Sequence, residues 1–171
     1  LEEHFRHLVP IPMTVGNDMD FLTMGCWAQK HPDAGSLVTL FMGGNGIGGG
    51  MVINGRLWTG ASGYCSEVGF LPVYERLNKG SLGLPPAEHI SELYARLIQV
   101  YAVTVNPHMM VLYRHPLLEG RLDEIRRLCV SYLPSKAIPS IELSYDYQQD
   151  YEKGLFTVAK SLEQAVSEGG L

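Results

Sequence analysis

The sequence has few cysteines and no long apolar run, and each shortage excludes a class of protein. Its three cysteines, Cys26, Cys65 and Cys129, lie far apart and form no CxxC motif. This spacing argues against a disulfide framework and favours buried thiols in a reducing compartment. No apolar run reaches the ~18 residues that a membrane span requires, and the start of the sequence lacks the pattern of a signal peptide. We therefore expect a cytoplasmic protein that does not enter a membrane.

Basic residues are also scarce. The sequence has 13 lysines and arginines against 18 aspartates and glutamates, which gives a formal net charge of −5. Binding to nucleic-acid phosphates needs clustered lysine and arginine, so any contact with DNA would have to come from a region outside these residues. Apolar residues, by contrast, make up 46% of the sequence, which is enough for the core of one domain.

The most distinctive stretch covers residues 37–70. Apolar residues flank six glycines between Gly43 and Gly50, which predicts a strand, a glycine-rich turn and a second strand. Asn54-Gly55 then predicts a two-residue hairpin turn and a returning strand over residues 56–59. The glycine run has two interpretations: a tight turn, or a loop whose backbone N–H groups approach a phosphate. It matches neither a P-loop nor a Rossmann signature, since no Lys-Ser or Lys-Thr follows it and it opens no helix.

Three motifs in a fixed order carry a family resemblance. Gly16-Asn17-Asp18 comes first, a hydrophobic strand entering GxGIGGG follows, and the run INGxLxxGxSGxxxExG ends at Gly69. Residues 1–165 resemble the ROK family of sugar kinases and sugar-responsive transcriptional repressors. The amino-terminal lobe of that family carries a DxGGT-type phosphate loop, which has no counterpart here. The resemblance therefore implies that residues 1–171 are a carboxy-terminal lobe of a ROK-type sugar-binding module.

The resemblance implies a ribonuclease-H-like fold of the actin and hexokinase type, in which a mixed sheet is flanked by helices. The hydrophobic periodicity of the sequence agrees with an α/β lobe. Beyond the hairpin, we expect helices that end near residue 8 and that cover residues 19–29, 85–103, 118–133 and 150–166, and strands over 12–15, within 106–114 and over 140–144.

The resemblance assigns sugar contacts to Asn17, Asp18 and Glu67. In a kinase, Asp18 would be the general base that accepts the proton of the attacking sugar hydroxyl. Glu67 matches the glutamate of the family's ExGH motif, and its carboxylate would accept hydrogen bonds from neighbouring sugar hydroxyls. Structural alternatives stay open: an Asn or Asp at this position could cap the helix that follows, and Glu67 could be an ordinary surface residue.

The family's nucleotide and zinc segments are altered. The resemblance implies nucleotide contacts at Gly44, Asn45, Gly46 and Gly48, with Asn45 where the family usually has threonine. Phe70 replaces the histidine of ExGH, and residues 71–86, where the family binds zinc, contain no cysteine or histidine. Zinc needs about four nitrogen or sulfur ligands, so we expect no structural zinc and no other metal site formed by this chain.

The functional reading depends on a further substitution. Tyr113-Arg114 occupy the position of a Gly-Gly pair that lies under the adenosine in ROK kinases, and bulky side chains there would disfavour ATP. Together with Asn45 and Phe70, this favours the sugar-sensing, inducer-binding lobe of a transcriptional regulator. The alternative is a sugar kinase that uses Mg-ATP, with Asp18 as its base. A lobe that binds neither ligand and serves in oligomerisation is a third reading. The expected ligand is a sugar or sugar phosphate, and a homo-oligomer stays open.

Overall fold

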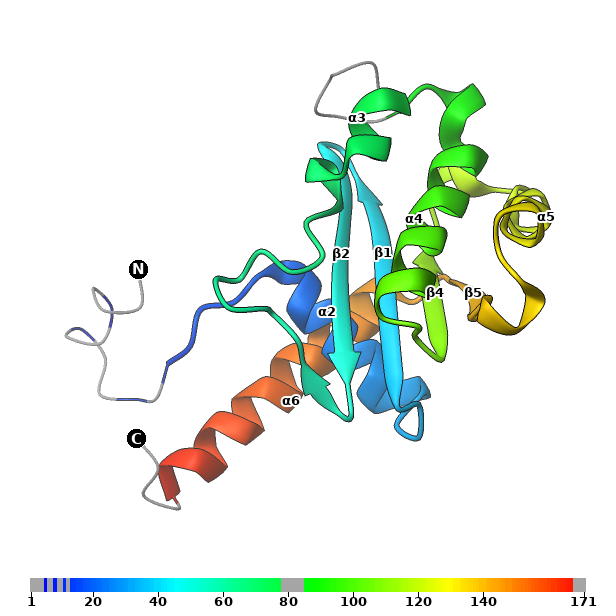
Figure 1. Cartoon of the computed structure of the whole chain (residues 1–171). Helices are drawn as coiled ribbons and strands as arrows, with labels where there is room; N and C mark the ends of the chain where they lie inside the picture. Colours follow the sequence, from blue (N-terminus) through cyan, green and yellow to red (C-terminus); the bar gives the residue numbers. More distant parts are fainter. Residues whose placement is uncertain (1–4, 6–7, 9–10, 12, 78–84, 168–171) are drawn as a thin grey trace.

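The computed structural model describes residues 5, 8, 11, 13–77 and 85–167. Its centre is a five-stranded sheet with the strand order β3-β2-β1-β4-β5 (Figure 1). Strand β1 pairs antiparallel with β2 and parallel with β4, and β5 extends the parallel part. The strands are β1 (Ser36–Gly43), β2 (Gly46–Ile53), β3 (Arg56–Leu57), β4 (Met109–Tyr113) and β5 (Ser140–Ser144). The predicted α/β architecture with a mixed sheet is therefore confirmed.

Helices cover both faces of the sheet (Figure 1). Helices α2 (Asp18–Lys30) and α6 (Tyr147–Ser167) pack on one face, while α4 (Ile90–Thr104) and α5 (Leu122–Tyr132) pack on the other. Helix α3 (Pro72–Leu77) follows the β-hairpin. Short 3₁₀ helices are formed by Val68–Phe70, Ala87–His89, Pro116–Leu118 and Ser135–Ala137. In the described part of the chain, no helix combines the length and apolar composition needed to cross a membrane.

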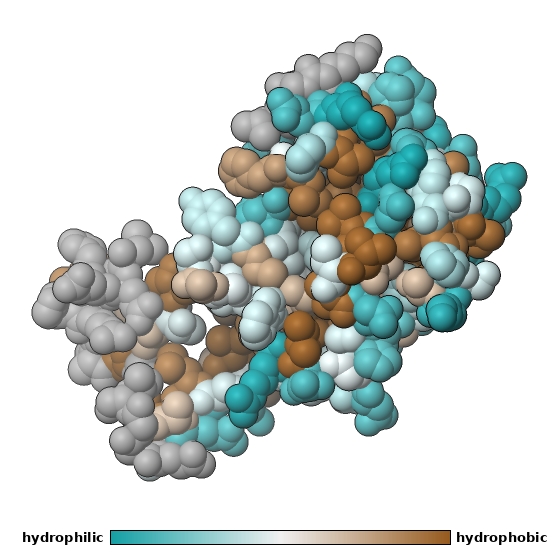
Figure 2. All heavy atoms as spheres, viewed as in Figure 1, coloured by the Kyte–Doolittle hydropathy of each residue, from teal (hydrophilic) through white to brown (hydrophobic). Residues whose placement is uncertain are grey.

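The sheet separates two cores. Val38, Leu40 and Met42 of β1 belong to the larger core, which also contains residues of α4 and α5. Leu37 and Phe41 belong to the smaller core on the α2 side. Successive residues of a strand point to opposite faces, so this central strand is buried almost continuously. On the face viewed in Figure 2, apolar surface gathers between β2 and α4.

The two predicted hairpin turns are present. Gly43 pairs with Gly46 across the Gly44-Asn45 turn. Asn54 and Gly55 have φ angles of 49° and 72°, the left-handed conformation that a two-residue hairpin turn requires. The returning strand β3 is two residues shorter than predicted and contains residues 56 and 57 alone.

Other elements differ from their predictions, including α6, which begins at residue 147 instead of 150. Residues 13–17 form no strand and lead without regular structure into α2. Helix α5 begins at residue 122 instead of 118, because a 3₁₀ turn and Gly120, at φ 71°, precede it. Helix α3 was not predicted at all. The expected helix over residues 1–8 lies almost wholly outside the described residues.

Helices α2 and α6 touch through their backbones. A Cβ atom placed on Gly25 of α2 would lie 1.7 Å from the carbonyl oxygen of Asp150. A Cβ atom placed on Gly154 of α6 would lie 1.7 Å from the carbonyl oxygen of Phe21. No real side chain tolerates either distance, so the crossing requires glycine at both positions.

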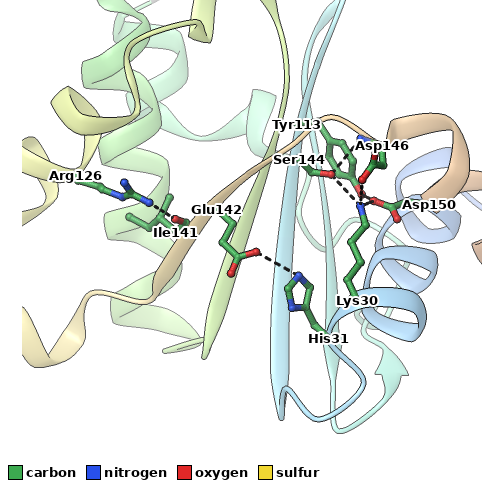
Figure 3. Close-up of polar contacts among 9 residues, drawn as sticks. All are labelled: Lys30, His31, Tyr113, Arg126, Ile141, Glu142, Ser144, Asp146 and Asp150. Atoms are coloured by element: carbon green, nitrogen blue, oxygen red, sulfur yellow. Dashed lines mark hydrogen bonds and ion pairs between the residues drawn. The ribbon is translucent and has the colours of Figure 1, made fainter.

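A polar cluster fixes the start of α6 (Figure 3). Asp150 is fully buried and accepts hydrogen bonds from Lys30 Nζ at 2.7 Å and from the Tyr113 hydroxyl at 2.6 Å. Lys30 also contacts Ser144 and Asp146, each at 3.1 Å. Burial alone would lower the pKa of Lys30, but its hydrogen bonds with Asp150 and Asp146 outweigh this effect and raise the pKa. The cluster therefore joins α2, β4, β5 and α6 around a charged lysine.

Replacing Lys30 with methionine should lower the free energy of unfolding by about 2 kcal/mol, because Asp150 would keep a buried charge without its partner. This value is below that of a fully buried pair, since the Lys30 side chain is 23% exposed and partly screened by solvent. Urea denaturation at pH 7 measures the effect. Lys136→Met removes an exposed lysine and should change the free energy of unfolding by less than about 0.5 kcal/mol.

The pH dependence of this loss follows from the direction of the Lys30 pKa shift. A raised pKa in the folded protein means that the lysine contributes its full stabilisation below its unfolded-state pKa and loses it as the pH rises through the folded-state value. The difference between the native protein and Lys30→Met should thus be constant from pH 7 to 9 and shrink at strongly alkaline pH. Equal losses in the Lys30 and Lys136 variants would contradict the role of the cluster.

Candidate functional site

A pocket of about 360 Å³ lies where the β1–β2 turn, the start of α2 and the 3₁₀ turn at Val68–Phe70 meet. We call it the front pocket. It brings together residues that are far apart in the sequence. Six of the seven predicted site residues line it: Asp18, Gly44, Asn45, Gly46, Gly48 and Glu67. The seventh, Asn17, is not among its lining residues.

Asn17 instead caps helix α2. Its side-chain oxygen accepts a hydrogen bond from the Met19 N–H at 2.9 Å, and Oδ1 of Asp18 accepts from the same N–H at 2.8 Å. Acidic residues in a first turn also stabilise a helix through its dipole. The capping role that the sequence left open for Asn17 is therefore present, and the cap places the exposed Asp18 side chain at the edge of the front pocket.

The glycines of the hairpin serve different purposes. A Cβ atom on Gly44 would meet nothing within 4 Å, so this turn presents open backbone to the pocket. A Cβ atom on Gly48 would lie 2.9 Å from the Met19 side chain, and one on Gly50 would lie 2.0 Å from Thr23 Oγ1. These two glycines let α2 pack directly on β2. The glycine run therefore combines an open turn with close packing of a helix on the sheet.

A strained loop presents Glu67 to the front pocket. Ser66 has a φ of 69°, which is uncommon for a residue other than glycine. Val68 follows and is 2% exposed, so it anchors the loop in the larger core. Glu67 lies between this anchor and the left-handed residue, and its own side chain is exposed. The loop thus holds a carboxylate at the pocket without burying it.

Asp20 was missed by the sequence analysis. Burial raises the pKa of its carboxyl group, a hydrogen bond with the Asn17 backbone opposes this rise, and the nearby charges of Asp18 and Glu67 add to it. Those charge effects place three carboxyl groups within electrostatic reach of one another. Asp18 and Asp20 both lie in the first turn of α2, and this spacing could have identified Asp20 as a neighbour of Asp18. The proximity of Asp20 to Glu67, however, depends on the tertiary fold.

The remaining wall of the front pocket is apolar. It is formed by Met19, Phe41, Ile47, Phe70 and Tyr74. Phe70, which replaces the family's histidine, is 73% exposed. The strict alternation of β1 could have identified Phe41, since it lies on the same side of the strand as Leu37.

An aromatic cluster continues from the front pocket toward α6. The rings of Phe41 and Tyr147 stack with their centroids 4.5 Å apart. Tyr147 in turn stacks parallel to Tyr151, and Tyr151 meets Phe21 edge-on. These tyrosines cap a core, as their residue type commonly does.

The charge of the front pocket limits its ligands. Among the described residues that line it, two are carboxylates and none is a lysine, arginine or histidine. The described residues also contain no group of three or more histidine, cysteine, aspartate and glutamate side chains arranged to hold a metal ion. Such a wall can accept hydrogen bonds from hydroxyl groups, whereas a phosphate would need a cation from another source.

Tyr113 and Arg114, at the end of β4, were both expected to obstruct a nucleotide, and the structure supports this for Arg114 alone. Tyr113 is 1% exposed, and its side chain points into the smaller core, where its hydroxyl reaches Asp150. Arg114 is exposed, and its guanidinium donates to Glu119 Oε1 at 2.7 and 3.0 Å. Tyr113 therefore leaves the surface clear, and Arg114 alone places bulk at this strand end.

Comparisons with known proteins agree with the overall fold. The family model described as "ROK family" matches residues 1–85. Among solved structures, a ROK hexokinase from Thermus thermophilus is 17% identical, with a TM-score of 0.69 over 98% of this chain and 70% of that chain. A putative N-acetylmannosamine kinase from Listeria monocytogenes is 17% identical, with a TM-score of 0.72 over 95% of this chain and 70% of that chain.

A third solved structure is a ROK family glucokinase from Streptomyces griseus in complex with glucose and AMPPNP. It is 18% identical, with a TM-score of 0.60 over 96% of this chain and 72% of that chain. A comparison with curated proteins gave no match. The fold is therefore the ribonuclease-H-like, actin and hexokinase type. With the family model and this fold in agreement, the chain belongs to the ROK family.

Proposed function

We propose that this chain is the carboxy-terminal, sugar-binding lobe of a ROK-type transcriptional regulator that senses a neutral sugar. The observation that supports it most is the front pocket, which has two carboxylates, an open backbone turn and no basic side chain among its described lining residues. Carboxylates accept hydrogen bonds from adjacent sugar hydroxyls. A sugar phosphate would be repelled by the same carboxylates, so the proposal is a sugar without charge.

Each wall of the front pocket has a part in this proposal. Glu67 and Asp18 would accept hydrogen bonds from two sets of hydroxyls on the sugar ring. Phe41, Phe70 and Tyr74 would pack against its apolar C–H surface. The chain spans about 70% of the length of the solved ROK proteins to which it was compared, and we propose that the opposite wall of the cleft belongs to an amino-terminal lobe. Contact with DNA would come from a region outside this chain.

Three substitutions support sensing over catalysis. Asn45 replaces a threonine in the turn that the family uses for nucleotide phosphates. Phe70 replaces the histidine that the family uses for sugar recognition. Arg114, held by its ion pair with Glu119, stands at the end of β4 where the family has glycine. A sensor needs a sugar cleft and no phosphoryl transfer, so it tolerates all three.

A sugar kinase that uses Mg-ATP is the second candidate. It is favoured by one observation: Asp18 and the Gly44-Asn45-Gly46 turn line the same pocket. In this reading, Asp18 accepts the proton of the attacking hydroxyl and the backbone N–H groups of the turn approach the phosphates. Bound Mg²⁺ would neutralise charge on the transferred phosphoryl group. The solved glucokinase from Streptomyces griseus contains glucose and AMPPNP.

The test is a thermal-shift and phosphorylation assay on the full-length protein. Glucose, mannose, N-acetylglucosamine and N-acetylmannosamine are each added with and without Mg-ATP, and ADP formation is followed in the same samples. A sugar-dependent rise in melting temperature without turnover supports the sensor. Sugar-dependent ADP formation would instead support the sugar kinase. No shift and no turnover with any sugar would contradict both and favour a lobe that serves in oligomerisation.

Asp18→Asn separates the two candidates further. In a kinase it should lower kcat by at least about 100-fold, because it removes the general base, with a smaller change in sugar affinity. In a sensor it should weaken sugar binding about tenfold through loss of a charged acceptor. Steady-state kinetics and calorimetric titration measure the two quantities. Unchanged turnover in Asp18→Asn would exclude the base role, and unchanged affinity would exclude a sugar contact.

A further inference from the structure

A second pocket lies behind the loop that carries Glu67. This back pocket has a volume of about 240 Å³ and is lined by residues 64–68, by Met51 of β2 and by the second half of α4. The exposed surface of its wall is mostly apolar, although Tyr64, Ser66 and Thr104 also line it. It belongs to the apolar surface that gathers between β2 and α4 in Figure 2. Glu67 lines both pockets, so one loop separates them.

The back pocket contains a buried hydroxyl without a partner. Tyr101 of α4 lines the pocket and is 6% exposed, and the structure gives its hydroxyl no hydrogen-bond partner. Burial raises the pKa of Tyr101 to about 12. The Ser66 side chain approaches the hydroxyl closely enough to oppose this rise, but without the geometry of a hydrogen bond. The hydroxyl is therefore neutral at physiological pH and able to donate a hydrogen bond. An unpaired buried hydroxyl is unfavourable, so an acceptor in the pocket would be stabilised.

Strand β2 leaves room for this hydroxyl. A Cβ atom on Gly49 would lie 3.0 Å from the Tyr101 hydroxyl oxygen and 2.9 Å from the Ser66 carbonyl oxygen. A larger residue would thus press on both the tyrosine and the loop. Gly49 therefore leaves space beside the back pocket, whereas its neighbours Gly48 and Gly50 let α2 pack on the sheet.

Tyr94 provides an internal comparison. It lies on α4 two turns before Tyr101, is fully buried, and its hydroxyl also has no partner. Tyr94 is not among the residues that line the back pocket. A phenylalanine at either position removes the same group from the same helix, but only the change at Tyr101 alters the described wall of this pocket.

We propose that the back pocket binds a small uncharged molecule with an apolar body and one carbonyl-type oxygen, which accepts a hydrogen bond from Tyr101. An apolar cavity of ~150 Å³ holds benzene, so 240 Å³ suits a six-membered ring with a short substituent. The mostly apolar surface of the wall disfavours a charged ligand, and the Glu67 carboxylate at the pocket disfavours an anion. This site does not depend on the sugar-binding proposal.

Cys65 reports directly on occupancy. It lies half-buried on the wall of the back pocket. Cys26 and Cys129 are fully buried, and burial raises the pKa of their thiols to about 12 and about 11, so they should react slowly. The rate of Cys65 alkylation by iodoacetamide is measured by peptide mass spectrometry on the full-length protein, with acetophenone as the probe. We expect acetophenone to slow alkylation saturably, at a concentration on the order of 1 mM.

The hydrogen bond is tested with a matched probe and matched variants. α-Methylstyrene has the shape of acetophenone but a CH₂ group in place of the carbonyl oxygen. It should protect Cys65 about fivefold less tightly, the value of one hydrogen bond. Tyr101→Phe should remove this preference, whereas Tyr94→Phe should keep it. Circular dichroism confirms that both variants fold.

Three results would overturn the proposal. Alkylation of Cys65 could be insensitive to acetophenone, the two probes could protect equally in the native protein, or Tyr101→Phe could keep the fivefold preference. Because the readout is a thiol on the back pocket, it is independent of whether any sugar binds the front pocket.

Discussion

Gly25→Ala should lower the free energy of unfolding by about 3 kcal/mol, one of the two largest effects that we expect. The new methyl group would lie 1.7 Å from the Asp150 carbonyl oxygen. That atom belongs to the backbone of α6, so no side chain can rotate to relieve the clash, and the two helices must separate. The separation would also disturb the polar cluster of Lys30 and Asp150. Urea denaturation measures the loss.

Gly154→Ala and Gly69→Ala are the controls. Gly154 makes the reciprocal contact at the same crossing, so its alanine variant should lose a similar amount. One separation of the helices relieves both clashes, and the double variant should therefore lose less than the sum of the two. A Cβ atom on Gly69 would meet nothing within 4 Å, and Gly69→Ala should be nearly neutral. Additive losses, or a stable Gly25→Ala, would contradict a shared backbone contact.

Glu67→Ala should weaken sugar binding by at least about 100-fold, the other large effect. A hydrogen bond to a charged acceptor contributes about 1.5–3 kcal/mol, and a carboxylate in a fork geometry accepts two. Glu67→Gln keeps the shape and one acceptor but loses the charge, so it should cost about tenfold. Calorimetric titration with the sugar that shifts the melting temperature gives both values. In a regulator, Glu67→Ala should also abolish sugar-induced release from DNA.

Glu75→Ala tests whether this effect is specific. Glu75 is an exposed glutamate on α3, and it is not among the residues that line the front pocket. Its replacement should leave sugar affinity within a factor of two. If Glu67→Ala bound the sugar as tightly as Glu75→Ala, the front pocket would not be the sugar site.

Local signals in the sequence were enough for most of the fold. Asn54-Gly55 is a strong turn signal, because few residue pairs accept positive φ at both positions. Apolar periodicity predicted the end of α4 to within one residue, but the predicted start at residue 85 was five residues too early, because Ala87–His89 form a 3₁₀ turn before the helix. Weaker elements failed where tertiary contacts decide the outcome: the stretch over residues 13–15 finds no strand to pair with in the described structure.

The site was harder to predict. Local chemistry alone gave no reason to connect Asp18 with Glu67, and the family resemblance supplied the connection. Asp20 was missed because its perturbation depends on burial and on a residue far along the chain. The error at Tyr113 was avoidable in part: Met110 and Leu112 belong to the larger core, so strand alternation directs Tyr113 to the opposite face.

The backbone contact between α2 and α6 has a mechanical consequence. Two helices that touch at glycine and share the ion pair of Lys30 with Asp150 should turn together, as a single lever. One arm begins at Asp18, beside the front pocket. The other continues along α6 from Gly154 to Ser167, a distance of about 20 Å at 1.5 Å per residue, away from the sheet in Figure 1. A small rotation of α2 at the pocket would therefore produce a larger displacement at Ser167.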